Sequence, residues 1–172
     1  MAELGRAALV VCLGLSAYAL LAGGWAIAAH RRRLAVSAQN ALVAAFGAAL
    51  VAGIVLVVAL VRHDFSLVYV QRLTSRELPL GYTLSAFWGG QEGSLLLWLL
   101  VLTGYSTAAV YTSRRRHADL LPWIVPPLAL VATFFAFLLV AIASPFETQV
   151  APANGVGLNP SLQNPYMRGR RG

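Results

Sequence analysis

Residues 41–61 read ALVAAFGAALVAGIVLVVALV, and no charged side chain interrupts them. An α-helix needs about 20 apolar residues to cross the hydrocarbon core of a bilayer, and within lipid its backbone groups must bond to one another. The segment therefore predicts a membrane span. Three further apolar runs predict spans at about 7–29, 94–111 and 120–143. We expect an all-α fold, a polytopic membrane helix bundle with four transmembrane helices.

The composition of the whole chain agrees with a membrane protein. Of its 172 residues, 59% are hydrophobic and 11% are charged, whereas about a quarter of the residues in a soluble domain are charged. The net charge is +7, and all 13 basic residues are arginines, which cluster at the ends of the apolar runs. Membrane topology and anionic lipid headgroups explain this placement more simply than nucleic acid does. The single cysteine, Cys12, excludes an internal disulfide.

Two arginine clusters predict the orientation in the membrane. Arg31–Arg33 follow the first span and Arg114–Arg116 follow the third, so alternation of the spans places both clusters on one side. The positive-inside rule makes that side cytoplasmic, and both termini are then extracytoplasmic. We divide the chain into a four-span membrane domain, 1–144, and an extracytoplasmic tail rich in Pro, Gly and Asn, 145–172.

Two local patterns lead to more specific expectations. Pro126 and Pro127 each lack a backbone donor, which predicts a kink in the fourth span or a delayed start of its helix. In the loop after the second span, Phe65, Leu67 and Tyr69 alternate with the residues between them, as in a strand or an interfacial segment.

The most distinctive run is Trp88–Trp98, WGGQEGSLLLW, in which three glycines and one carboxylate precede an apolar segment. If one helix ran from Leu84 to Tyr111, Glu92 would lie about 12 Å along it, and an ionisable group there would be a functional candidate. If the glycines instead unwound the chain and the helix began at Ser94, Glu92 would stand at a helix N-terminus, where the dipole favours it. The sequence leaves both alternatives open. The candidate site residues are Trp88, Gly89, Gly90, Gln91, Glu92, Gly93, Ser94 and Trp98.

None of the three histidines, His30, His63 and His117, lies in the middle of a span. Each borders the end of a span, and ligation of a metal or haem usually requires a supporting cluster of side chains. We therefore interpret all three as interfacial residues. The chain contains no phosphate-binding loop, dinucleotide fingerprint or nucleophile elbow, so the residues alone indicate no catalytic group and no metal site.

Four stretches carry a resemblance to a known family. Leu78–Trp98, with LPLGY, FWGGQEGS and LLLW, resembles the CcmF/NrfE family of cytochrome c-type biogenesis proteins. The segments DFSLVYV at 64–70, SPFE at 144–147 and GLNPSLQNP at 157–165 are similar to the family's first outer loop, its exit from the fourth span and the loop beyond. The resemblance extends over nearly the whole chain up to Tyr166 and keeps the order of the segments.

The resemblance implies a role in cytochrome c maturation, as a membrane component that handles haem for covalent attachment to apocytochrome c. It implies the bacterial inner membrane as location and haem as cofactor. The implied partners are a haem carrier protein, other maturation subunits, apocytochrome c and membrane lipid, but not nucleic acid. The candidate site residues above would then contact haem or a partner protein.

The end of the chain departs from the family pattern. Family members continue into a His-Pro-Pro segment and a tryptophan-rich haem-handling segment, whereas here Met167 is followed by Arg168–Gly172, RGRRG. We therefore expect an N-terminal fragment that lacks the family's haem ligands and is inactive alone. The resemblance implies that full-length members take part in ligating haem to apocytochrome c, whereas we expect no enzymatic role for this fragment. The alternatives are a proton- or solute-translocating subunit that uses Glu92 and a purely structural membrane subunit.

Overall fold

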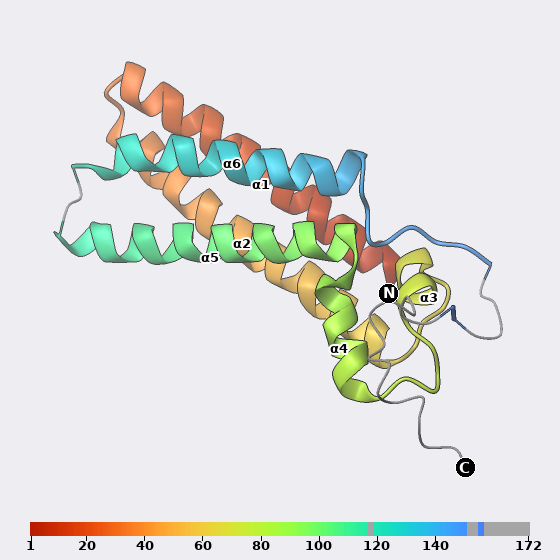
Figure 1. The fold of residues 1–172 in the computed structure, drawn as a ribbon. Helices are drawn as coiled ribbons and strands as arrows, with labels where there is room; N and C mark the ends of the chain where they lie inside the picture. The colour runs from red at the N-terminus through yellow and green to blue at the C-terminus, as the bar shows by residue number, and fades with distance from the viewer. Residues whose placement is uncertain (117–118, 151–154, 157–172) are drawn as a thin grey trace, which may run out of the picture.

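The computed structural model describes residues 1–116, 119–150 and 155–156, without the side chains of residues 115 and 116. The named elements of this part of the chain are all helices (Figure 1). They are α1 (Ala2–Ala28), α2 (Arg32–Val61), α3 (Val68–Leu73), α4 (Leu80–Gly89), α5 (Gln91–Arg116) and α6 (Leu121–Ala141). Four of them, α1, α2, α5 and α6, are long and apolar enough to cross a membrane. The predicted fold class, an all-α bundle with four such helices, is confirmed.

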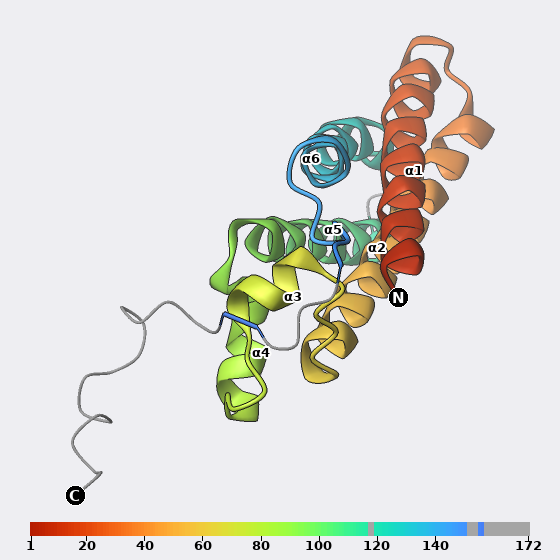
Figure 2. The ribbon, with the colours of Figure 1, turned by 90° about the vertical axis from the view of Figure 1, so that its right-hand side faces the viewer.

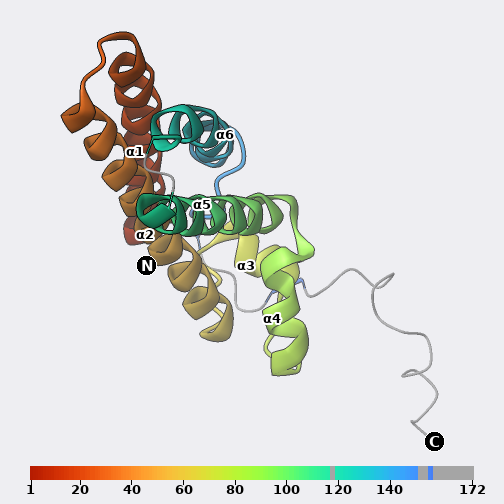
Figure 3. The ribbon, with the colours of Figure 1, turned by 90° about the vertical axis from the view of Figure 1, so that its left-hand side faces the viewer.

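The long helices form two crossing pairs. Figures 2 and 3 show α6 nearly end-on and α5 foreshortened below it, while α1 and α2 run lengthwise down the view. The helix α1 packs against α2 and α6, and α5 packs against α2 and α6. The short helices α3 and α4 lie at the end of the bundle where α5 begins (Figure 1).

Small side chains make up much of the contact faces between the long helices, beside buried leucines such as Leu42 and Leu56. On α2 the buried positions include Ala38, Ala45, Ala49, Ala52 and Ala59, which recur at helical spacing. Large apolar side chains on the other faces are exposed. Within lipid, small residues let helix backbones approach closely, so van der Waals packing stabilises the bundle while the large side chains face the hydrocarbon.

The helix α6 begins at Leu121 and continues through Pro126 and Pro127, so the predicted delayed start is wrong. Proline holds φ near the helical value, and its costs are a lost donor and the space taken by its ring. The ring of Pro126 packs closely on Gly23 of the neighbouring helix α1, where a Cβ atom would lie 3.1 Å from Cγ of Pro126.

Three of the long helices, α1, α2 and α5, extend beyond the apolar runs that predict them, whereas α6 lies within its run. The helix α2 begins at Arg32, well before residue 41, and α5 continues to Arg116. Hydropathy reports which part of a helix is apolar enough for lipid, whereas intrahelical hydrogen bonds continue into the polar interface. The apolar runs therefore locate helices better than they locate helix ends.

Two of the histidines terminate helices. His30 and His63 follow α1 and α2 with φ values of 54° and 51°. After each helix the residue beyond the histidine donates across six residues, Arg31 to the Ala26 carbonyl and Asp64 to the Ala59 carbonyl. This pattern is a Schellman motif with histidine at the left-handed position where glycine is usual. His117 lies outside the described residues.

The segment after α6 packs against the first turns of α1 and against the residues at the start of α3. Phe146 is buried against Gly5 of α1. The backbone N–H of Val68 donates to the carbonyl of Glu147 (3.0 Å), and an isolated antiparallel bridge joins Leu67 to Thr148. Of the predicted tail, residues 145–150 and 155–156 are described, and Met167–Gly172 lie outside the described residues.

The alternation predicted for the loop after α2 has a structural basis. Phe65, Leu67 and Tyr69 are all buried, as their shared side suggested. Val70 is buried as well, because the chain turns into α3 at Val68. The segment is therefore not a strand but a turn at 65–66 and one bridge residue, Leu67, followed by a short helix.

Candidate functional site

The chain breaks its helical path inside the WGGQEGS run. The helix α4 ends at Gly89, Gly90 is extended with φ −115° and ψ 164°, and α5 begins at Gln91. Figure 1 shows α4 turning away from the axis of α5 at this point. Glu92 therefore lies in the first turn of α5. The helix-start alternative is correct, although α5 begins at Gln91 rather than at Ser94 and a separate helix, α4, precedes it.

Side chains cap the end of α4. The hydroxyl of Tyr69 donates a shared hydrogen bond to the carbonyl oxygens of Ala86 (2.8 Å) and Phe87 (3.1 Å). The hydroxyl of Ser94 donates to the carbonyl of Trp88 (2.8 Å). The last four carbonyls of a helix have no intrahelical partner, and three consecutive carbonyls of α4 find one here. The junction is thus held from α3 by Tyr69 and from α5 by Ser94.

Two of the three glycines make room for Tyr69. A Cβ atom on Gly93 would clash with the carbonyl oxygen of Phe87 and with the Tyr69 hydroxyl, and one on Gly90 would lie 2.7 Å from Cε2 of Tyr69. A Cβ atom on Gly89 would meet no atom within 4 Å. Close approach of backbone to a neighbouring group is a common reason for glycine. Gly90 and Gly93 are therefore required by packing at this corner, whereas Gly89 is not.

The phenol of Tyr69 is only 3% exposed. Burial raises the pKa of Tyr69 to about 12, and the carboxylate of Glu92 adds to the rise. The backbone amides of Gly90 and Gly93 and the guanidinium of Arg72 lower the pKa in part. The phenol is therefore neutral at physiological pH and acts as a hydrogen-bond donor.

Glu92 pairs with an arginine of α3. Nη1 of Arg72 lies 3.4 Å from Oε1 of Glu92, with side-chain exposures of 62% and 22%. An ion pair this open to solvent contributes about 0–1 kcal/mol. The position of Glu92 in the first turn of α5 also complements the helix dipole. Both features describe a structural role at the end of the bundle rather than an ionisable group inside a membrane span.

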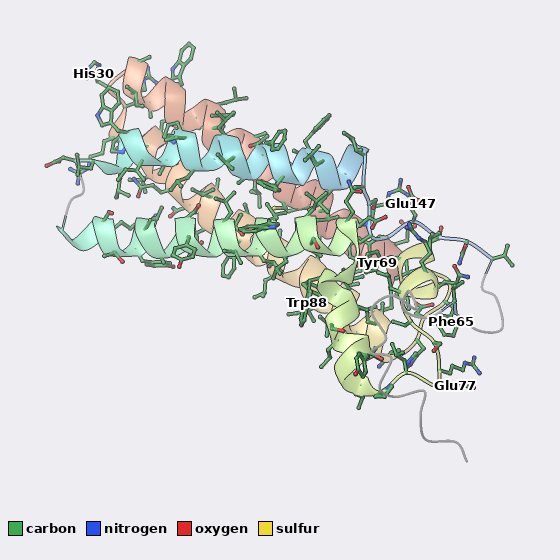
Figure 4. The ribbon with its side chains drawn as sticks, viewed as in Figure 1. His30, Phe65, Tyr69, Glu77, Trp88 and Glu147 are labelled. Carbon is green, nitrogen blue, oxygen red and sulfur yellow. The ribbon has the colours of Figure 1, made fainter. Side chains whose placement is uncertain are left out.

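The run Trp88–Trp98 is called the motif below. Its two tryptophans lie on different helices and face outward. Trp88 on α4 is 55% exposed and Trp98 on α5 is 62% exposed. Figure 4 shows Trp88 on the side of α4 that is turned away from α3. Gln91 is exposed as well. The structure thus brings Gly90, Glu92 and Gly93 together with α3, and it leaves Trp88, Gln91 and Trp98 on the surface of this chain.

Sequence reasoning missed Tyr69 and Arg72 as the partners of the motif. Both lie about 20 residues before it, and no spacing rule connects a short outer helix with a later helix break. The one signal was the similarity of segment 64–70 to the family's first outer loop. That similarity marked the segment but did not indicate what it contacts.

Among the described residues, no two histidines lie close enough together to ligate one haem iron from both faces of the ring. His30 ends α1 and His63 ends α2, a helix of 30 residues and therefore about 45 Å in length. Figure 4 shows His30 at the end of the bundle opposite Tyr69. No group of three or more His, Cys, Asp or Glu in the described part of the chain is placed to hold a metal ion.

The sequence of this chain is similar to those of several known proteins. No family model matches it. The cytochrome c-type biogenesis protein CcmF of Escherichia coli K12 is 31% identical over 169 residues, which cover 97% of this chain and 26% of that protein. CcmF of Pseudomonas aeruginosa is 36% identical over 171 residues, which cover 94% of this chain and 25% of that protein. The chain thus spans about a quarter of the length of the curated relatives it matches.

A solved structure has the same arrangement of helices. The structure titled "Cytochrome c Heme Lyase CcmF" superposes with a TM-score of 0.79 and 35% identity, covering 88% of this chain and 25% of that one. The similarity thus extends over nearly the whole chain, in sequence and in fold, and the four long helices make this a multi-pass membrane protein. The chain belongs to the CcmF/NrfE family of cytochrome c-type biogenesis proteins.

Proposed function

We propose that this chain forms a membrane part of a cytochrome c maturation component, which handles haem for covalent attachment to apocytochrome c. The observation that carries the proposal is the match in sequence and fold to proteins named for cytochrome c biogenesis. The proposed partners are a haem carrier protein, other maturation subunits and apocytochrome c. The proposed location is the bacterial inner membrane.

Within that component, the junction around Gly90 serves as a rigid corner that fixes α4 at an angle to α5. The side chains that build the corner, among them Tyr69 and Ser94, are engaged in internal hydrogen bonds. The tryptophans that the corner displays, Trp88 and Trp98, are exposed. We therefore propose that the motif works by presenting Trp88 and Trp98 to haem or to a partner protein, and that Glu92 contributes to the corner.

The placement of the arginines supports an orientation with both termini extracytoplasmic. Arg31, Arg32 and Arg114 line one cavity and so lie at the same end of the bundle. The motif and the first residues of α1 lie at the other end (Figure 1). An arginine-rich end that faces the cytoplasm would place the motif on the side where cytochromes c are assembled.

Deletion of the gene for this chain in its own host tests the proposed function. We expect c-type cytochromes with covalent haem, measured by haem staining of denaturing gels, to disappear while apocytochrome c is still made. The b-type cytochromes, whose haem is not covalently bound, serve as control and should persist. Restoration by the plasmid-borne gene must accompany the loss. Unchanged haem staining in the deletion strain would reject the proposal.

A further inference from the structure

A cavity opens at the arginine-bearing end of the bundle, far from the motif. Its volume is about 720 Å³, within the range of roughly 300–1,000 Å³ of small-ligand sites. The end of α1, the start of α2, the end of α5 and the start of α6 surround it. Figure 4 shows His30 at this end. The cavity therefore lies between two helix connections that are far apart in the sequence, the one from α1 to α2 and the one from α5 to α6.

The polar part of the cavity is basic. Arg31, Arg32, Arg114 and His30 line it, against a single carboxylate, Asp119. The structure describes all six acidic residues of the chain, and within that part none of them forms an ion pair with Arg114. An anion that entered the cavity would therefore meet a net positive charge.

Two neutral side chains hold the guanidinium of Arg114 in place. Its Nε donates to Oε1 of Gln39 (3.0 Å) and its Nη2 donates to Oδ1 of Asn40 (2.7 Å). The Gln39 side chain is buried. Amide acceptors orient the group without neutralising its charge. A fixed guanidinium fork is the arrangement that proteins use to bind phosphate groups.

The remaining wall of the cavity is apolar. It consists of Ala26, Ile27, Ala35, Val36, Leu121, Pro122 and Trp123. Trp123 is 65% exposed, and tryptophan prefers the level of the lipid headgroups. A ligand that fits has an anionic head and an apolar body, and the cavity lies where membrane helices end.

Membrane topology alone accounts for arginines at this end, but not for their arrangement. The positive-inside rule requires only that basic residues lie near the ends of the spans. It requires neither a cavity among four helices nor a guanidinium held by Gln39 and Asn40. Basic pockets between membrane helices bind the headgroups of anionic lipids. We propose that this cavity binds the phosphodiester headgroup of an anionic phospholipid, with Arg114 on the phosphate and Trp123 beside the upper acyl chain.

Quenching of Trp123 fluorescence by brominated lipid tests the proposal. The full chain, with Trp25, Trp88 and Trp98 replaced by phenylalanine at their exposed positions, is placed in phosphatidylcholine nanodiscs. Brominated phosphatidylglycerol should quench Trp123 more strongly than brominated phosphatidylcholine at equal mole fraction. Arg114→Gln should lower this preference about fivefold, the effect of one basic residue near an anionic lipid.

The controls separate a site from general surface charge. Arg62→Gln removes the same charge from an exposed position at the other end of α2 and should leave the preference unchanged. Because Arg114 also joins α5 to α2, the double variant Arg31→Gln/Arg32→Gln provides a second test that keeps this link. Circular dichroism confirms that each variant is folded.

Three outcomes would overturn the proposal. Equal quenching by the two brominated lipids would show that no anionic headgroup is preferred. An equal loss in the Arg62→Gln variant would reduce the preference to net charge. Inorganic phosphate in millimolar excess should not relieve the quenching, because it lacks the acyl chains. If it does, the cavity is a site for free phosphate rather than for a lipid.

Discussion

The hydroxyl of Tyr69 donates to the carbonyl oxygen of Ala86 over 2.8 Å and so ties the short helix α3 to the last turn of α4. The same hydroxyl reaches the carbonyl of Phe87 at 3.1 Å. A break in a membrane protein helix leaves carbonyls without partners, and these are costly where water is excluded. Tyr69 satisfies two of them with one buried side chain. The corner that carries the family motif thus depends on a residue outside the motif.

Tyr69→Phe is predicted to lower the free energy of unfolding by about 1–3 kcal/mol, because it leaves buried carbonyl oxygens without a donor. Thermal unfolding in detergent micelles, followed by circular dichroism, measures the change. Tyr105→Phe is the matched control, since Tyr105 is 75% exposed and should tolerate the change. Equal stability of the two variants would contradict the capping role of Tyr69.

Gly93→Ala is predicted to destabilise the fold by about 1–3 kcal/mol, because its methyl group would overlap the backbone carbonyl of Phe87 and the hydroxyl of Tyr69. Gly89→Ala is the internal control. Its methyl group meets no atom within 4 Å, and alanine is a better helix former than glycine. We expect Gly89→Ala to be neutral or slightly stabilising in the same unfolding assay. The assignment of Gly93 to close packing is wrong if both variants behave alike.

The sequence predicted those features of the structure that depend on each residue's own surroundings, and it missed those that depend on contacts between distant segments. Lipid acts on every residue of a span, so an uncharged run such as 41–61 predicts a helix without knowledge of its neighbours. Contacts between distant segments have no such local signature. The bonds of Tyr69 to α4 and the packing of Pro126 against Gly23 each join residues that no periodicity connects. The resemblance predicted that the motif matters, but only the fold shows that Gly90 and Gly93 differ from Gly89 in their packing.

Glu92→Gln distinguishes the structural role of Glu92 from a role in proton transfer. Its ion pair with Arg72 is open to solvent, so we predict a loss of stability of at most about 1 kcal/mol and a similar loss for Arg72→Gln. Reconstituted in liposomes, the Glu92→Gln chain should show the same pH-dependent flux as the unchanged chain. Flux that is present in the unchanged chain and absent in the variant would support the translocating alternative instead.

Alkaline pH should destabilise the corner through Tyr69. Burial raises the pKa of Tyr69 to about 12, from about 10 for an exposed phenol, so the folded state holds this proton more tightly than the unfolded state. The resulting stability is fully present below about pH 10 and is lost as pH rises from about 10 to about 12. Unfolding measured across this range should show a smaller decline for Tyr69→Phe than for the unchanged chain. Tyr105→Phe should follow the unchanged chain, and identical slopes for all three would refute the assignment.

The left-handed turn at His63 leads to the last prediction. A residue other than glycine pays about 1 kcal/mol or more for a φ of 51°, so His63→Gly should be more stable than His63→Ala by about that amount. The two variants remove the same imidazole and differ only in the Cβ atom. The difference in their stability therefore measures the cost of the left-handed backbone conformation at residue 63. Thermal unfolding of both, beside the unchanged chain, measures it. Haem staining of cytochromes c in the host adds a functional measurement. If His63→Gly is stable but abolishes covalent haem, the imidazole has a role beyond ending α2; if maturation continues, His63 is a helix terminus and no more.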